Sequence, residues 1–489
     1  MSIQNKLAKA YFWNIFGKWG ARLLGIGSTL ILVRLIDPEA FGLVALATIC
    51  IGFFETLTGI GVDRYLISQT DLNDQSMNST WTLNIVLKMG VTIVLVVFSP
   101  LIADYFNEQN LQLIITVVAI NGFFAAFNNI GLVRLQKNLE FKKITYLGLV
   151  VKLLSTTVTL VFAYFSPDHW ALIAGGMVSV WLYMIGSYVV CPYRPVLNFA
   201  FDKKLFSFSF YILLRKIIRY SRNKADTLFV SKLFDTTAVG KYNIALEFSM
   251  LPLSEVISPA SAAMFPALSN FKNNKVELFD KTYKYFALIY LFIIPSIVGI
   301  WIVAPQFCPV ILGEKWADTA PIMSALAIMM LPYPLSALTN NLFDYLGKTK
   351  LSLFGDLIGL SLLVFGATFL LFDDITEFAE VRGLIGVIAF IIILIFTRLT
   401  LGLSLKIMGM VLLIPSLASA AMFMFFEFVY INPDISLIGL LINILIGGVS
   451  YTICLISLLY IVKPYSSIWA FWYNKGFELL NSRRKTLGS

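Results

Sequence analysis

The sequence predicts an all-α, polytopic membrane protein with about 14 transmembrane helices: two parallel six-helix lobes, then two C-terminal helices. Hydrophobic residues make up 58% of the 489 residues and charged residues 13%, against about 45–50% and about 25% in a soluble domain. Fourteen apolar segments follow one another along the chain, and the two halves resemble each other at a constant offset. This composition excludes a soluble enzyme, a disordered chain and a coiled coil.

Each apolar segment is long enough to cross a hydrocarbon core of about 30 Å as a helix. Helices are expected because only helices and closed barrels satisfy the backbone hydrogen bonds in lipid, and these runs lack the alternation of barrel strands. The predicted spans are 10–36, 40–66, 81–103, 111–133, 145–165, 170–191, 207–233, 238–265, 283–304, 321–343, 350–372, 383–403, 407–430 and 435–462.

The loop charges predict that both termini lie in the cytoplasm. With the N-terminus inside, the even-numbered connections are basic; the first holds Arg134, Lys137, Lys142 and Lys143. The odd-numbered connections are short and acidic. Lysine and arginine are enriched in cytoplasmic loops, so the net charge of +9 indicates membrane topology rather than nucleic-acid binding.

Few residues suit catalysis or metal binding. The four cysteines are far apart, which predicts no disulfide framework and no metal site. The only histidine is His169, in a Ser-Pro-Asp-His turn. No cofactor is predicted. The first apolar run is too long for a signal peptide, so we expect a retained first span.

An internal repeat is the most informative pattern. At an offset of 198, ILVRLIDPEAFGLVALA (31–47) aligns with FVSKLFDTTAVGKYNIA (229–245), with identities at Leu35, Asp37, Ala40, Gly42 and Ala47. Both copies predict a helix, a tight turn at an aspartate and a returning helix. Copies six spans apart have the same orientation, as in several transporters that work by alternating access.

The repeat defines the predicted domains. Residues 1–191 form the N-terminal six-helix lobe, 192–206 a cytoplasmic linker and 207–403 the C-terminal six-helix lobe. Residues 404–462 form the last two spans, and 463–489 a basic, aromatic cytoplasmic tail. The aromatic part of the tail predicts an amphipathic helix on the membrane surface.

Charged side chains inside the predicted spans are the candidate site residues, because a charge near the bilayer centre costs at least about 2.5–3.5 kcal/mol. Lys18 and Arg22 share a face of the first span, and Glu55 and Asp63 share a face of the second. Lys88 and Lys152 lie about two turns inside the cytoplasmic edge, where snorkelling and cavity lining explain them equally well.

The seventh span begins RKIIRYSRNKAD, and its residues Arg215, Arg219 and Arg222 share one face. One interpretation is a basic helix lying on the cytoplasmic surface; the other is the cationic wall of a polar cavity. The eighth span contributes Glu247 and Glu255. Asp344, Asp356, Arg398 and Glu427 lie near helix ends and are interpreted as interfacial.

A cavity with these basic walls predicts an anionic, polar ligand, since arginine pairs bidentately with phosphate and carboxylate. The acids Glu55, Asp63, Glu247 and Glu255 either balance the cations or bind a coupling proton or sodium ion. No GxxxxGK[ST] run is present for binding ATP.

Several stretches resemble one known family. The stretches ILVRLIDPEAFGLVALATICIGFFETLTGIG, LQKNLEFKK (135–143), NKADTLFVSKLFDTTAVGKYNIA, FPALS (265–269) and LGEKW (312–316) resemble bacterial polysaccharide exporters, the oligosaccharide-lipid flippases of the MOP (multidrug/oligosaccharidyl-lipid/polysaccharide) superfamily, in the colanic acid and lipopolysaccharide repeat-unit exporter branch. The resemblance covers roughly residues 10–370.

The resemblance implies a multi-pass protein of the bacterial inner membrane. It implies transfer of undecaprenyl-pyrophosphate-linked oligosaccharide repeat units to the periplasmic leaflet, where a polymerase and a chain-length regulator would act on them. Two alternatives remain: a multidrug or cation antiporter of the same superfamily, which the basic residues disfavour, and a membrane-embedded polysaccharide polymerase, which would need a larger outer loop.

Overall fold

The structure is a computed structural model that describes residues 3–58, 66–67, 72–200, 209–255, 275–345, 349–429 and 435–475. Every regular element in these ranges is helical. By its internal contacts the chain divides into two compact units, Met1–Gly240 and Lys241–Ser489. The predicted lobe boundaries stay a prediction.

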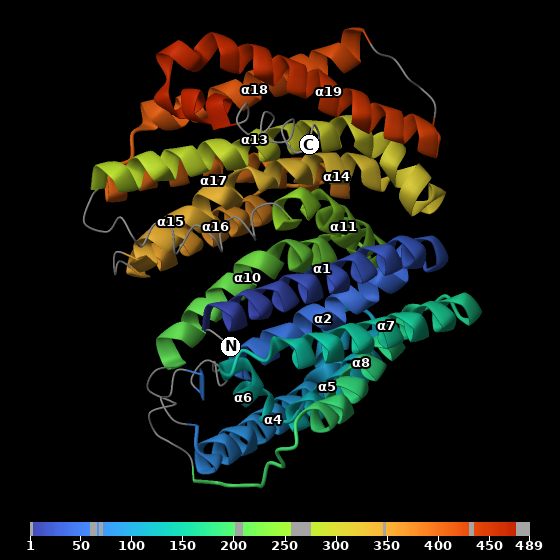
Figure 1. The fold of residues 1–489 in the computed structure, drawn as a ribbon. Helices are drawn as coiled ribbons and strands as arrows, with labels where there is room; N and C mark the ends of the chain where they lie inside the picture. Colours follow the sequence, from blue (N-terminus) through green and yellow to red (C-terminus); the bar gives the residue numbers. More distant parts are fainter. Residues whose placement is uncertain are drawn as a thin grey trace, which may run out of the picture. The chain divides into compact units, whose positions relative to one another are not determined.

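The first unit is built from long helices joined by short turns (Figure 1). Its elements are α1 (Ile3–Leu35), α2 (Pro38–Thr58), α4 (Asp74–Phe106), α5 (Gln109–Phe124), η1 (Ala125–Phe127), α6 (Leu132–Lys137), α7 (Phe141–Phe165), α8 (His169–Val190), α10 (Ser209–Leu233) and the start of α11 (Thr236–Ser249). The helix α2 is central, because α4, α5, α8 and α10 all pack against it, while α1 packs on α7.

The two copies of the sequence repeat have the same helix boundaries. The first helix ends at Leu35 and the next begins at Pro38; 198 residues later, α10 ends at Leu233 and α11 begins at Thr236. Asp235 caps α11 by accepting a hydrogen bond from the backbone N–H of Ala238 at 2.7 Å, as expected of an aspartate at a helix N-terminus. The predicted helix, aspartate turn and returning helix are therefore present in both copies.

The segment 191–200, which begins the predicted linker, lies extended along α4. Asn78 Oδ1 accepts hydrogen bonds from the Tyr193 hydroxyl (2.7 Å) and the Val196 N–H (3.1 Å), and Thr82 Oγ1 accepts one from Asn198 N–H (2.8 Å). Burial raises the pKa of the Tyr193 phenol above its usual range. The link out of the first six helices is therefore fixed to α4 up to residue 200.

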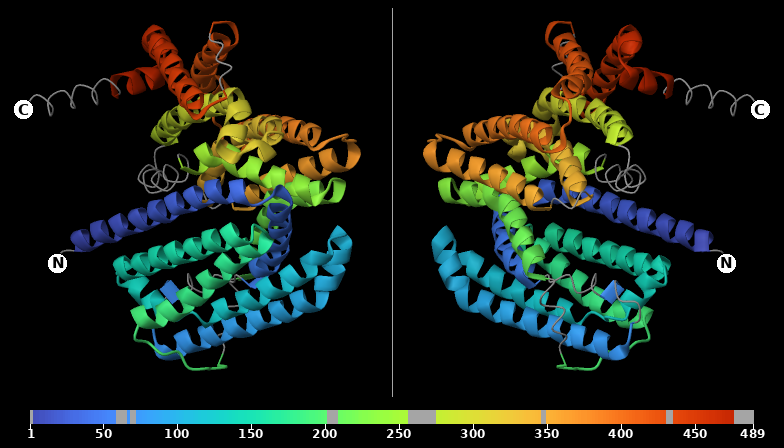
Figure 2. Two further views of the ribbon diagram at one scale, coloured as in Figure 1. Left: turned by 90° about the vertical axis from the view of Figure 1, so that its right-hand side faces the viewer. Right: turned by 90° about the vertical axis from the view of Figure 1, so that its left-hand side faces the viewer.

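The second unit contains the rest of α11 and the helices that follow it (Figure 2). They are α13 (Lys275–Phe307), the π-turn η2 (Cys308–Leu312), η3 (Glu314–Trp316), α14 (Thr319–Ala327), η4 (Ile328–Met330), α15 (Pro332–Tyr345), α16 (Thr349–Phe369), α17 (Ile375–Leu401), α18 (Leu405–Phe428), α19 (Leu437–Val462) and η5 (Lys463–Tyr465), followed by a helical stretch at 467–475.

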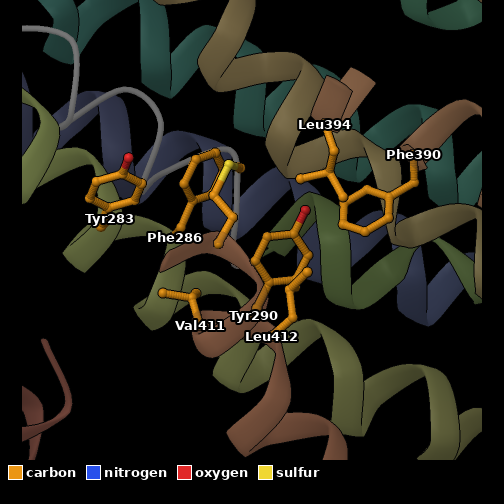
Figure 3. Close-up of a pocket in the computed structure, with 8 residues that line it drawn as sticks. Tyr283, Phe286, Tyr290, Phe390, Leu394, Val411 and Leu412 are labelled. Atoms are coloured by element: carbon orange, nitrogen blue, oxygen red, sulfur yellow. The ribbon is translucent and has the colours of Figure 1, made fainter. Parts of the chain in front are cut away.

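The core of this unit forms around α13 (Figure 3). Phe286 and Tyr290 are almost fully buried beside Phe390 of α17 and Val411 of α18. The Tyr290 hydroxyl donates to the backbone carbonyl of Leu331 at 3.0 Å. The cavity among these rings holds only about 10 Å³, which is the space of one water at most, so it is a packing gap and not a binding site.

The aromatic tail belongs to this core. Trp469 is 1% exposed and its indole N–H lies 3.3 Å from the carbonyl oxygen of Met410, while that of Trp472 donates to Lys284 O at 2.9 Å. Trp469 thus packs against α18 inside the protein, and the location of this helix at the membrane surface stays a prediction. Residues 476–489 lie outside the described part.

Eleven helices are long and apolar enough to span a membrane in the described residues. Each coincides with a predicted span, which confirms a polytopic all-α membrane protein. The predicted spans 10–36, 207–233 and 238–265 are not among these eleven: the first two form α1 and α10, which carry charges, and the third begins as α11 and continues beyond the described residues. The total of fourteen crossings and the cytoplasmic termini stay predictions.

Candidate functional site

The predicted cations of the first unit lie on four helices. Lys18 and Arg22 are on α1, Lys88 on α4, Lys152 on α7, and Arg215, Arg219 and Arg222 on α10. Lys18 and Arg219 are exposed, whereas Arg22, Lys88, Lys152 and Arg222 are half-buried. The side chain of Arg215 lies outside the described part, as does the whole of Asp63.

One of these cations forms an ion pair with a predicted acid. Lys88 Nζ lies 2.5 Å from Glu55 Oε1, and this contact joins α4 to α2. The side chains are 19% and 45% exposed respectively. The same carboxylate faces Gly122 of α5, where an added Cβ would lie 3.8 Å from Oε1. Glu55 and Lys88 therefore balance each other, and the lack of a side chain at Gly122 leaves room beside the carboxylate.

Lys152 extends toward α1 from α7. Its Nζ lies 4.0 Å from the position that a Cβ would take on Gly25, less than one turn after Arg22. The structure thus brings the ammonium of Lys152 close to the helix that carries Lys18 and Arg22. A larger side chain at position 25 would contact this lysine.

The arginines of α10 are held beside α2 by Tyr220. The Tyr220 hydroxyl donates to the carbonyl of Ile49 at 2.7 Å, and the ring packs on Phe53 with centroids 6.3 Å apart. Tyr220 follows Arg219 directly and precedes Arg222 by two residues. The basic stretch therefore packs along a candidate membrane span, on the segment of α2 that leads to Glu55.

The predicted acids Glu247 and Glu255 belong to the second unit. Glu247 is exposed on α11, and Glu255 is half-buried and accepts a hydrogen bond from the Ser254 hydroxyl at 3.1 Å. Within the described ranges, no group of three or more histidine, cysteine, aspartate or glutamate side chains lies close enough to hold a metal ion.

One acid of the second unit is buried, which the sequence did not reveal. Asp356 is only 1% exposed and lies in α16, so its side chain packs inside the protein, while its interfacial position stays a prediction. One turn earlier Ser352, also 1% exposed, donates to Asn340 Oδ1 of α15 at 2.6 Å. The signal was the spacing of Ser352 and Asp356, four residues apart in an apolar run, which places both on one helix face.

The second unit also contains a large apolar groove that sequence reasoning did not identify. It encloses about 720 Å³ and is bordered mainly by α13, α18 and α19, including Pro295, Phe426, Gly448 and Tyr451. The Tyr451 hydroxyl donates to Leu291 O at 2.8 Å, so its ring presents apolar surface to the groove. Gly448 has no other atom within 4 Å of an added Cβ and leaves the wall open.

Comparison with known proteins decides the family. Residues 31–321 match the family described as "Polysaccharide biosynthesis protein", which is more than half of the chain. The chain belongs to this family. Its match spans both copies of the internal repeat.

Curated relatives of this polysaccharide biosynthesis protein are distant but cover most of its length. "Lipopolysaccharide biosynthesis protein WzxC" of Escherichia coli (strain K12) is 24% identical over 333 residues, which is 67% of this chain and 68% of the relative. "Teichuronic acid biosynthesis protein TuaB" of Bacillus subtilis (strain 168) is 25% identical over 355 residues, 70% and 71% of the two chains.

Solved structures show the fold of this family member. The "Lipid II flippase MurJ, inward closed conformation" superposes with a TM-score of 0.73 at 16% identity, covering 91% of this chain and 98% of that one. An inward-facing multidrug resistance MATE family transporter of the MOP superfamily gives a TM-score of 0.62 at 15% identity, covering 78% and 94%. The chain therefore has the fold of multi-pass MOP-superfamily transporters, as the resemblance implies.

Proposed function

We propose that this protein is a flippase that carries lipid-linked oligosaccharide units across the bacterial inner membrane by alternating access, for O-antigen, capsule or exopolysaccharide synthesis. The observation that carries the proposal is the set of cations on α1, α7 and α10 within one unit of a polysaccharide biosynthesis protein. We propose undecaprenyl pyrophosphate as the lipid carrier, and a polymerase and a chain-length regulator as the proteins that act next on the product.

The charges suit a pyrophosphate cargo. A cation in the hydrocarbon region is costly and is retained where it faces protein or a wet cavity. Arginine remains charged and its planar fork binds phosphate oxygens in pairs. We assign Arg22, Arg219 and Arg222 to the phosphates, with Lys18, Lys152 and Arg215 beside them. Lys88 instead neutralises Glu55.

The packing of α10 supports its interpretation as a cavity wall. Tyr220 attaches the basic stretch to α2, a candidate span, through Ile49 and Phe53. A helix lying on the cytoplasmic surface would have its apolar face toward lipid instead. The cationic face of α10 thus runs beside a membrane helix, where an anionic head group can reach it.

The apolar groove of the second unit suits the lipid part of the cargo. Each buried CH₂ group contributes about 0.8 kcal/mol, so even a few units of a polyprenyl chain would bind appreciably in a cavity of about 720 Å³. The walls offer aliphatic and aromatic surface, and the hydroxyl of Tyr451 is satisfied by the backbone. We propose that this groove binds a polyprenyl chain.

Asp356 is the acid that best suits ion coupling. Asp356 is only 1% exposed, and it lies in α16, an apolar helix long enough to span the membrane. Proton or sodium uptake at Asp356 therefore changes the charge inside the second unit, which is what coupling to a gradient requires. Glu55 is assigned to charge balance, and Asp63, Glu247 and Glu255 remain predicted coupling residues.

A cation antiporter is the second candidate, because a MATE transporter has the same fold. Such a protein would need an acidic pocket for its cationic substrates. In the first unit, Glu55 is paired with Lys88, whereas several other cations lie on α1, α7 and α10. The balance of charge favours an anionic cargo.

Deletion of the gene in its source bacterium tests the proposal. The expected result is loss of one surface polysaccharide together with accumulation of lipid-linked repeat units in the inner leaflet, both restored by the plasmid-borne gene. A cation antiporter predicts increased sensitivity to cationic drugs and normal polysaccharide instead. Normal polysaccharide with no accumulated lipid-linked units would refute the flippase.

A further inference from the structure

A polar cavity of about 220 Å³ lies in the first unit, where two helical turns come together. One turn joins α4 to α5 and the other joins α10 to α11. The cavity does not include the cations assigned to the phosphates, and it is separate from the apolar groove of the second unit. Its lining includes Tyr105, Glu108, Ser231, Lys232, Asp235 and Thr236.

Two contacts hold the two turns together beside this cavity. The Thr236 hydroxyl donates a hydrogen bond to the carboxylate of Glu108. Lys232 Nζ lies 3.5 Å from the backbone carbonyl oxygen of Tyr105 and 4.5 Å from the centre of its ring. The polar groups of the cavity are therefore positioned before any ligand binds, which reduces the ordering cost of binding.

The charges in the cavity suit a neutral ligand better than an ion. Lys232 places an ammonium near the carboxylates of Glu108 and Asp235. The lysine repels a cation and the two carboxylates repel an anion. Two helices end here and two begin, so the partial charges of their ends largely cancel.

The same side chains can form several hydrogen bonds with hydroxyl groups. A carboxylate has about four acceptor positions. Glu108 accepts a hydrogen bond from the Thr236 hydroxyl, and Asp235 accepts one from the backbone N–H of Ala238, so each carboxylate can accept more. A ligand rich in hydroxyl groups therefore fits these walls, and the ring of Tyr105 offers apolar surface beside them.

The size of the cavity limits the ligand. A single water needs about 10–15 Å³, and this cavity of about 220 Å³ is many times larger. The space is sufficient for one six-membered sugar ring and too small for a whole oligosaccharide. The volume and the hydrogen-bonding groups together indicate a single sugar residue.

We propose that this cavity binds one neutral monosaccharide residue of the oligosaccharide cargo, with Glu108 and Asp235 accepting hydrogen bonds from its hydroxyl groups. The inference rests on the proposed function and adds a sugar site to the proposed phosphate and polyprenyl sites. Both turns belong to odd-numbered connections, which are predicted to face the periplasm. The sugar would then be bound on the side of the membrane to which the repeat unit is delivered.

Saturation-transfer NMR on the purified full-length protein tests sugar binding directly. The probes are glucose, galactose, mannose and N-acetylglucosamine, each alone and each with an equal concentration of glucuronate. At least one neutral sugar is expected to receive saturation from the protein. Glucuronate should not displace it, because the two carboxylates of the cavity repel an acidic sugar.

Ser231→Leu places a larger side chain in the cavity and should abolish the sugar signal. Its matched control is Ser457→Leu on α19, which does not line the cavity. The two serines are alike in that each donates a hydrogen bond to a carbonyl of its own helix, Ser231 to Leu228 at 2.8 Å and Ser457 to Ile453 at 2.9 Å.

Glu108→Gln removes a charged acceptor without adding volume, so it decides the matter if Ser231→Leu does not fold. The sugar should bind this variant at least about tenfold more weakly, which is the usual effect of losing a hydrogen bond to a charged group. The control is Asp104→Asn, at an exposed acid of α4 that does not line the cavity. Thermal unfolding checks that each variant is folded.

Three results would overturn the sugar site: no signal from any of the four sugars with the folded parent, an undiminished signal in the folded cavity variants, or displacement of the sugar by glucuronate. None of them depends on the deletion test. Loss of polysaccharide on deletion together with any of these results would leave the flippase standing without this site. Sugar binding at the cavity with normal polysaccharide after deletion would refute the flippase alone.

Discussion

Lys88 Nζ lies 2.5 Å from Glu55 Oε1, and this ion pair ties the middle of α4 to the central helix α2. Lys88→Met should therefore destabilise the protein, since a carboxylate would remain among membrane helices without the lysine that neutralises it. Breaking a fully buried pair costs about 3–5 kcal/mol, and the loss here should be smaller because Glu55 is 45% exposed. Thermal unfolding of the purified parent and variant proteins measures this loss of stability.

The double variant Lys88→Met/Glu55→Gln separates charge balance from cargo binding. With both charges removed, thermal stability should recover most of the loss, and export should return to within about twofold of the parent. A double variant that is stable but exports nothing would show that Lys88 holds cargo instead.

Arg22→Ala and Arg219→Ala should abolish most export without lowering the amount of protein in the membrane. A hydrogen bond to a charged group contributes about 1.5–3 kcal/mol, and each 1.4 kcal/mol is a factor of about ten in affinity. Lipid-linked cargo should thus bind each variant about 10- to 100-fold more weakly. Lysine at either position should restore part of the lost affinity, because it keeps the positive charge but lacks the planar guanidinium group that binds two phosphate oxygens at once.

Lys143→Ala is the matched control for both arginine variants. Lys143 is 56% exposed and forms an ion pair with Glu140 on its own helix end, so its loss should leave export unchanged. Normal export by both arginine variants would contradict the assignment of these cations to the cargo.

Asp356→Asn should remove the dependence of transport on the coupling gradient. In vesicles with an imposed proton or sodium gradient, the parent is expected to transport faster than without one, whereas the variant should transport at one slow rate. Thermal unfolding of the variant checks that a lost gradient response does not come from a loss of folding. The control is Glu427→Gln, an exposed acid on α18; a gradient response in Asp356→Asn equal to the parent's would exclude coupling at this residue.

The local structure of this protein was predictable from sequence to a far greater extent than its contacts. The turn at Asp37 and its copy at Asp235 were found from aligned residues, because a helix boundary depends on a few neighbouring side chains. The pairing of Lys88 with Glu55 was not predictable, since the two lie on different helices and periodicity says nothing about which faces meet.

Burial was the second property that the sequence did not reveal. Asp356 was interpreted as interfacial from its distance to a helix end, yet packing against α15 and α17 buries it. The residues around Trp469 have the composition of a surface helix, yet the Trp469 side chain lies in the core of the second unit. In both cases a tertiary neighbour decided the environment, and hydropathy measures only the chain's own residues.

Filling the apolar groove should block transport without affecting folding. Gly448→Leu would place a branched side chain in open space within the groove, since no other atom lies within 4 Å of an added Cβ there. The expected result is normal thermal stability with export reduced at least about tenfold. Gly409→Leu on α18 is the control, because its added Cβ also meets no other atom and the residue does not border the groove. If the lipid tail lies elsewhere, the two leucine variants will export equally well; if the groove holds it, only Gly448→Leu will accumulate lipid-linked units in the inner leaflet.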